Sequence, residues 1–136
     1  MKDVKQIILV RKDLRMGVGK TASQVAHASL GVVLQKMSTD YGSSSQDITA
    51  KTSFYEKGGP FDQWLNGPFT KICLKVSSEE ELMSLYNRAT EQGIPSCLIT
   101  DSGKTEFNGV PTKTCCAIGP HWSEEIDKIT GHLQLL

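Results

Sequence analysis

The sequence predicts an α/β fold in which a mixed, mostly parallel four- or five-stranded sheet is flanked by helices on both faces. Short apolar runs without polar alternation, such as residues 6–11 (QIILVR), are typical of strands that are covered on both faces. These runs alternate with segments of helical periodicity, as in α/β domains. With 136 residues, the chain suits one three-layer domain over residues 1–136 with a single core.

The first half is expected to contain one strand and one long helix. The strand covers residues 6–11, and the helix covers 20–36, where apolar residues recur at helical spacing. Residues 38–67 are rich in Ser, Thr, Gly and Asp, which favours a loop excursion. Within this excursion, residues 61–65 (FDQWL) are predicted to form a short amphipathic turn that docks Trp64.

The second half is predicted to continue the sheet and to cover it with two more helices. The expected elements, in order, are a strand at 71–76, a helix over 77–92, strands at 96–100 and 112–118, a helix over 124–130 and an edge strand at 132–136. Acidic residues in the first turn favour the start of the helix over 77–92, and Gly93 is a natural residue to end it.

The connections between these elements predict which segments meet. Each strand–helix–strand step implies parallel neighbours, whereas the helix-free connection between 96–100 and 112–118 implies an antiparallel pair. The ends of the first and third strands and the start of the fourth then lie on one rim, where ligands of such sheets commonly bind.

Composition narrows the possible function classes and locations. The 15 basic residues balance the 15 acidic ones, so any site for a phosphate must come from local clustering. The four cysteines lack paired spacing and are interpreted as buried thiols rather than as a zinc site or disulfides. The apolar run in residues 1–10 is too short for a signal peptide or a membrane span. A cytoplasmic location is expected.

The segment before the first helix resembles the end of a phosphate-binding loop, but its spacing excludes that motif. In residues 16–21 (MGVGKT), Leu14 stands where the motif needs its first glycine. The turn at Gly19 still leads into a helix, whose unpaired N–H groups favour an anion. Lys20, in the first helical turn, fits such a site and fits a solvated surface lysine equally well.

Polar side chains are expected to gather at the rim. Lys20, Gln24 and His27 form one stripe of the first helix, although a plain polar helix face also explains Gln24 and His27. Asp101 directly follows the third strand, where a simple turn is the alternative explanation. We expect Lys20 and Asp101 to face each other across one cleft. No serine stands in a GxSxG motif, so hydrolysis here would use water directed by a carboxylate.

Several ordered segments resemble type II peptidyl-tRNA hydrolases. They are VRKDLRMGVGK at 10–20, ASQ at 22–24, HA at 27–28, ITDSGKTE at 99–106, AIGP at 117–120 and IDKITGHL at 126–133. The resemblance covers nearly the whole chain apart from residues 38–67. It implies a mixed sheet with helices, cleavage of the ester between a peptide and the 3′ end of tRNA, frequent homodimers, and no cofactor or metal.

The resemblance also implies a set of working residues. The expected catalytic residues are Lys20, Asp101 and Thr105, and the expected substrate-binding residues are Gln24, His27, Thr114 and Gly19. Contacts to tRNA phosphates are expected from Arg11, Lys12, Arg15 and Lys104. In this hypothesis Asp101 orients and deprotonates water, Lys20 steadies anionic charge, and Gln24 with the threonines places the ester.

Three departures from the family pattern, one of which is a longer loop at 38–67, affect binding more than chemistry. The opening motif of the family usually reads GKGK, but position 18 is valine, which removes one cation that could meet a phosphate. Position 23 is serine where alanine is common. The rival interpretation is a non-catalytic tRNA- or protein-binding member of the same fold, which has no chemical need for Lys20, Asp101 and Thr105 together.

Overall fold

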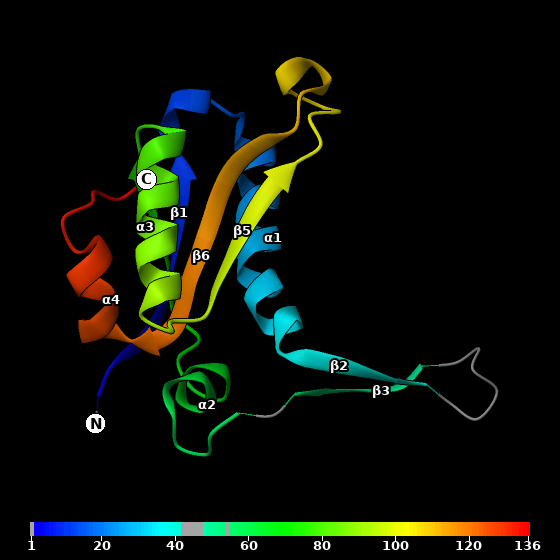
Figure 1. Ribbon diagram of the computed structural model, residues 1–136, viewed down its shortest axis with the longest axis vertical. Helices are drawn as coiled ribbons and strands as arrows, with labels where there is room; N and C mark the ends of the chain where they lie inside the picture. Colours follow the sequence, from blue (N-terminus) through cyan, green and yellow to red (C-terminus); the bar gives the residue numbers. More distant parts are fainter. Residues whose placement is uncertain (1, 42–47, 54) are drawn as a thin grey trace.

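A four-stranded sheet in the order β4-β1-β6-β5 forms the centre of the computed structural model, which describes residues 2–41, 48–53 and 55–136 (Figure 1). Its strands are β1 (Val4–Arg11), β4 (Lys71–Val76), β5 (Ser96–Asp101) and β6 (Thr112–Trp122). The four predicted strands before the last helix are present, and β6 runs four residues beyond the expected end at 118.

The mixed α/β class is confirmed, but the expectation of a mostly parallel sheet is wrong. Only β1 and β4 pair in parallel, whereas β6 runs antiparallel to both β1 and β5. The reason is that β6 lies between β1 and β5, so that three strands share a direction while only two of them are neighbours. For the same reason, β4 and β5 lie at opposite edges and are not the neighbours that their helical connection implied.

The predicted rim is confirmed. Asp101, the last residue of β5, pairs with Thr112, the first residue of β6, and Val10 near the end of β1 pairs with Cys115. Three segments that are far apart in the sequence therefore converge at one end of the sheet.

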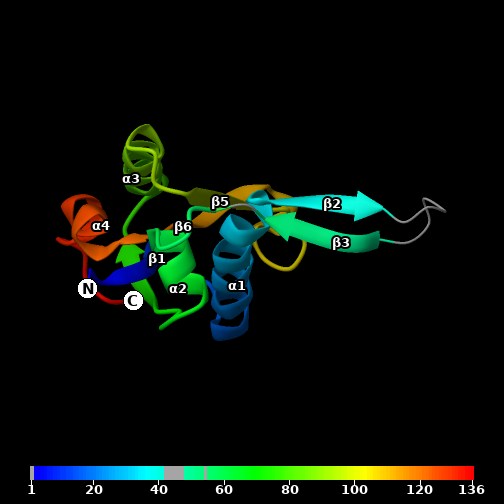
Figure 2. The ribbon, with the colours of Figure 1, turned by 90° about the horizontal axis from the view of Figure 1, so that it is seen from below.

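Helices cover both faces of the sheet, as Figure 2 shows. On one face α1 (Val18–Gln35) and α2 (Pro60–Leu65) pack over a core that includes Val32 and Trp64. On the other face α3 (Glu79–Glu91) and α4 (Ser123–Thr130) cover a second core. Helix α3 begins as predicted, because the Ser78 side chain accepts a hydrogen bond from the Glu81 N–H. None of the described helices is long and apolar enough to cross a membrane.

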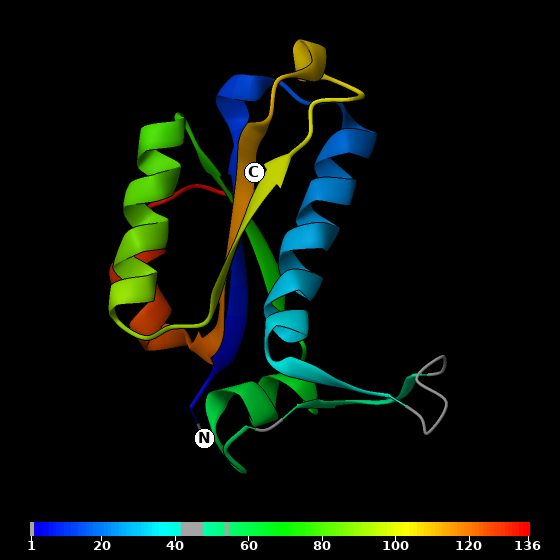
Figure 3. The ribbon, with the colours of Figure 1, turned by 45° about the vertical axis from the view of Figure 1, so that its right-hand side comes forward.

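Within residues 38–67, where a loop excursion was expected, the described residues include two strands and the helix α2. Strands β2 (Met37–Tyr41) and β3 (Ile48–Ser53) pair antiparallel and project from the body of the molecule (Figure 3). These two segments contain Thr, Tyr and Ile, which favour strands, but the Ser- and Gly-rich composition around them obscured this signal. The serines at 43–45 lie outside the described residues.

The predicted docking of Trp64 is confirmed. Its side chain is fully buried, and its indole N–H donates to the Thr70 carbonyl oxygen at 2.8 Å. The interpretation of the cysteines as buried thiols holds for Cys97, Cys115 and Cys116, whereas Cys73 is only half-buried.

The C-terminal segment lies beside β4 but does not form the predicted edge strand. Leu135 makes a single antiparallel bridge with Leu74. The flanking backbone hydrogen bonds run from the Lys75 N–H to Gln134 and from the Leu136 N–H to Cys73. The segment therefore covers part of that edge of the sheet with one bridge rather than with a full ladder.

Helix α1 approaches β5 closely because residue 31 is glycine. A Cβ atom at Gly31 would lie 2.5 Å from the Cys97 Sγ atom, well inside normal contact. Alanine is otherwise the better helix former, by about 1 kcal/mol. The close contact with Cys97 and the helix propensity of alanine therefore have opposite effects on stability when Gly31 is replaced by alanine.

We predict that Gly31→Ala lowers the free energy of unfolding by about 1–3 kcal/mol, because it overpacks the α1–β5 contact. In a Cys97→Ala background the same change should instead raise it by about 0.5–1 kcal/mol, because only helix propensity remains. Urea unfolding followed by circular dichroism measures both effects. A change of the same sign in both backgrounds contradicts the prediction.

Candidate active site

The first turn of α1 faces the end of β5 through an ion pair. The Lys20 Nζ atom lies 2.8 Å from Asp101 Oδ1 and 2.8 Å from Thr105 Oγ1. The side chains of Lys20 and Asp101 are each only 12% exposed. The structure thus brings together the three residues that the sequence predicted as catalytic, and it confirms that Lys20 and Asp101 face each other.

Asp101 is held by donors on both of its oxygen atoms. Oδ1 accepts from Lys20 and, at 3.2 Å, from Gln24 Nε2, while Oδ2 accepts from the Gly103 N–H at 2.8 Å. The hydrogen bond from Lys20 is the main cause that lowers the pKa of Asp101, followed by the Gly103 N–H, and together they outweigh burial. The carboxylate is therefore ionised across the neutral range.

Gln24 and Thr114 form a buried support behind Asp101. The Gln24 side chain is 2% exposed, and its Oε1 atom accepts from the Thr114 hydroxyl. Its Nε2 atom then points to Asp101, because the carbonyl end of the amide is already occupied. Thr114, on β6, is fully buried. A hydrogen-bonded relay thus runs from β6 through α1 to the end of β5.

The loop after β5 completes the site with two residues that sequence reasoning missed. Glu106 Oε1 accepts a long hydrogen bond, 3.4 Å, from the Gly17 N–H at the start of α1. The ring of Phe107 lies 5.9 Å from Lys20 Nζ and its φ is 67°, in the left-handed region that phenylalanine rarely adopts. Glu106 follows Thr105 directly, but no sequence pattern indicates where the Phe107 ring lies.

Gly19 precedes Lys20 in the first turn of α1 and faces open space. An added Cβ atom there would meet nothing within 4 Å. His27 is exposed on α1, and within the described residues no hydrogen bond joins it to Lys20, Asp101 or Thr105.

The four predicted cations are not equivalent. Arg11 is held by Asp13 at 2.7 Å and by the Lys113 carbonyl oxygen at 3.0 Å, so it has a structural role. Lys12, Arg15 and Lys104 are exposed.

Among the residues that the structure describes, no group of three His, Cys, Asp or Glu side chains is arranged to hold a metal ion. The chemistry that this arrangement offers is an ionised carboxylate beside a cation and a hydroxyl.

Comparison with known proteins gives consistent matches over almost the full length. A family model described as peptidyl-tRNA hydrolase PTH2 matches residues 4–136. A Methanopyrus kandleri protein named peptidyl-tRNA hydrolase is 43% identical over 97% of both chains. A Sulfolobus acidocaldarius protein of the same name is 42% identical over 98% of this chain and 100% of its own. A Drosophila melanogaster protein named probable peptidyl-tRNA hydrolase 2 is 35% identical over 97% of this chain and 61% of its own.

We predict that Lys20→Met raises the pKa of Asp101, because it removes the contact that lowers this pKa most. The carboxyl carbon of Asp101, followed by NMR during an acid titration, should titrate at a higher pH than in the wild-type protein. The matched change Lys104→Met replaces an exposed cation in the loop after β5, and it should leave the pH of the Asp101 transition unchanged. An unchanged Asp101 transition in Lys20→Met contradicts the assignment.

Proposed function

The chain belongs to the peptidyl-tRNA hydrolase PTH2 family, and we propose that Lys20, Asp101 and Thr105 form its catalytic centre. The reaction is hydrolysis of the ester between a peptide, or an N-blocked aminoacyl group, and the 3′ end of tRNA. One observation carries the proposal: a single lysine amine contacts both a carboxylate and a hydroxyl at the rim where substrates of such sheets bind.

Asp101 orients the attacking water. Its two oxygens accept three hydrogen bonds from the protein, which leaves acceptor capacity for a water molecule. The oxygen of this water forms the new bond to the ester carbonyl carbon, and Asp101 accepts its proton. The bond from that carbon to the 3′ oxygen of tRNA then breaks, and the departing oxygen takes up the proton. The products are a free peptide carboxylic acid and a 3′ hydroxyl.

Lys20 stabilises the negative charge that develops on the carbonyl oxygen. Its ammonium group has three N–H donors, of which two are directed at Asp101 and Thr105. The third donor is available to the developing oxyanion. Because Thr105 Oγ1 accepts from Lys20, its own O–H is available to hold the ester.

The remaining site residues are assigned to support and binding. Gln24 and Thr114 act through Asp101 as positioning residues, since their burial removes them from direct contact with substrate. The Gly19 backbone and the exposed His27 extend the substrate surface along α1. Contacts to tRNA phosphates come from the exposed cations Lys12, Arg15 and Lys104. Arg11 is held in place by Asp13 and has a supporting structural role beside them.

We further propose that the protein works in the cytoplasm, where peptidyl-tRNA arises in translation.

We also propose that the protein forms a homodimer. One face of α1 exposes Leu30 beside Phe69, and their side chains are 56% and 46% exposed. Between α1 and Trp64 this face is hollowed by about 370 Å³ of mostly apolar space. A second copy of the chain that covers this face would remove exposed apolar surface from water.

We predict that Asp101→Asn lowers kcat by at least about 100-fold, because the amide cannot accept the proton of water. The release of labelled N-acetylated amino acid from tRNA measures kcat, and circular dichroism confirms folding. Asp127→Asn is the matched control, because Asp127 also pairs with a lysine, Lys5, at 2.6 Å but lies on α4. Wild-type turnover in folded Asp101→Asn contradicts the base assignment.

For the homodimer, sedimentation equilibrium should give about twice the 14.9 kDa chain mass for the wild-type protein. We predict that Leu30→Asp shifts the protein to the monomer, because it places a charge in the apolar contact. Val110→Asp, at a similarly exposed apolar residue on the loop before β6, should leave the mass unchanged. A monomeric wild-type protein would show that the proposed dimer does not form.

A further inference from the structure

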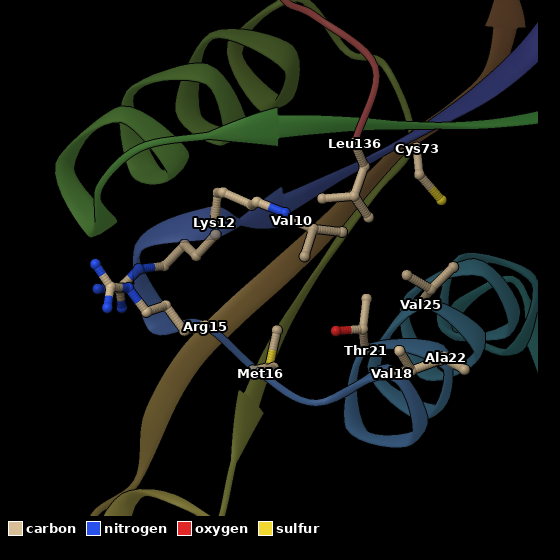
Figure 4. Close-up of a pocket in the computed structure, with 11 residues that line it drawn as sticks. Val10, Lys12, Arg15, Met16, Val18, Thr21, Ala22, Val25, Cys73 and Leu136 are labelled. Atoms are coloured by element: carbon tan, nitrogen blue, oxygen red, sulfur yellow. The ribbon is translucent and has the colours of Figure 1, made fainter.

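A second hollow of about 430 Å³ lies on the flank of α1 away from the Lys20–Asp101 pair (Figure 4). Thr21 and Val25 line it from α1, whereas Lys20 and Gln24 project from the flank that faces β5. The side chains of Met16 and Leu136 approach the same space from the preceding loop and the end of the chain. The hollow and the ion pair therefore share the first turns of α1.

The lining of this hollow combines an apolar interior with one hydroxyl. Its walls are mainly aliphatic or sulfur-containing, as at Met16, Val25 and Leu136. The hydroxyl of Thr21 points into the space between α1 and β1. A flat, weakly polar group fits such a lining, because it removes apolar surface from water and needs few hydrogen bonds.

The mouth of the hollow is cationic. Lys12 and Arg15 both line it and are exposed, and the described part of the chain shows no ion pair for either. Figure 4 shows the Lys12 side chain extending toward Val10 and Leu136 across the opening. Arg11 also lines the hollow but is already neutralised by Asp13. The unpaired charges favour a ligand that carries an anion next to its apolar part.

We propose that this hollow binds the base of a nucleotide at the 3′ end of tRNA, with the adjoining phosphate on Lys12 and Arg15. The inference rests on the proposed function and states which part of the substrate lies on each flank of α1. A nucleotide joins a flat base to a phosphate, which matches the apolar interior and the cationic mouth together. An apolar peptide side chain matches only the interior and leaves both cations without a partner.

The position of the hollow determines the path that the substrate would have to take. The ester is carried by the terminal ribose, so a base in the hollow and an ester beside Lys20 require the sugar to cross the first turn of α1. Gly19 lies in this turn, and the space above its Cα atom is open. The absence of a side chain at residue 19 therefore leaves a path between the two flanks.

The test is a titration with adenosine 5′-monophosphate, followed through the NMR signals of the Met16, Val25 and Leu136 methyl groups. We expect these signals to shift and saturate. Adenosine, which lacks the phosphate, should bind about tenfold more weakly, and Lys12→Ala should weaken binding of the monophosphate by a similar factor. Lys12→Ala should leave adenosine binding unchanged, because the base contacts remain.

Lys128→Ala is the matched control, because Lys128 is an exposed cation on α4, and it should bind the monophosphate as the wild-type protein does. Methyl signals that respond to N-acetyl-leucinamide but not to the monophosphate would overturn the proposal and assign the hollow to the peptide. Equal loss of adenosine and monophosphate binding in Lys12→Ala would overturn the phosphate contact. Folded Asp101→Asn should still bind the monophosphate, which separates this inference from the catalytic assignment.

Discussion

The ion pair between Lys20 and Asp101 is the constraint on which the site depends. Both side chains are largely withdrawn from water, so each charge needs hydrogen-bonding partners to offset its lost hydration. Thr105 supplies a partner to the cation, and Gln24 and Gly103 supply donors to the carboxylate. Removing either charge leaves the other poorly compensated, so the pair specifies the geometry of the loop after β5 as well as the chemistry.

The position of β6 makes this pair possible. Because β6 lies between β1 and β5, the helix that follows β1 packs across β6 and reaches β5 on the far side. Gly31 allows α1 to approach Cys97 of β5, and the Thr114 hydroxyl of β6 donates a hydrogen bond to Gln24 on α1. The position of β6 between β1 and β5 also separates β4 from β5, so that only one pair of neighbouring strands in this sheet is parallel. The feature that makes the sheet mixed is thus also the feature that aligns Lys20 with Asp101.

The sequence was informative where a function depends on local pattern and much less so where it depends on packing. Asp101 could be placed at the rim because it directly follows an apolar strand, and Lys20 because it opens a periodic helix. The burial of Thr114 could not be predicted, because threonine is equally suited to an exposed strand position. The place of β6 in the sheet and the contact between Phe107 and Lys20 depend on long-range packing, which no short motif encodes.

In the proposed arrangement, the two flanks of α1 divide the substrate according to charge and polarity. On one flank the ion pair provides charge where the ester is proposed to react, and on the other an apolar hollow carries its cations only at the mouth. Val18 fits this division, since it is 90% exposed and lines the hollow. Its side chain extends the apolar wall, and the phosphate is proposed to bind Lys12 and Arg15. In a chain without net charge, such local clustering is the means by which a polyanion can be held in one orientation.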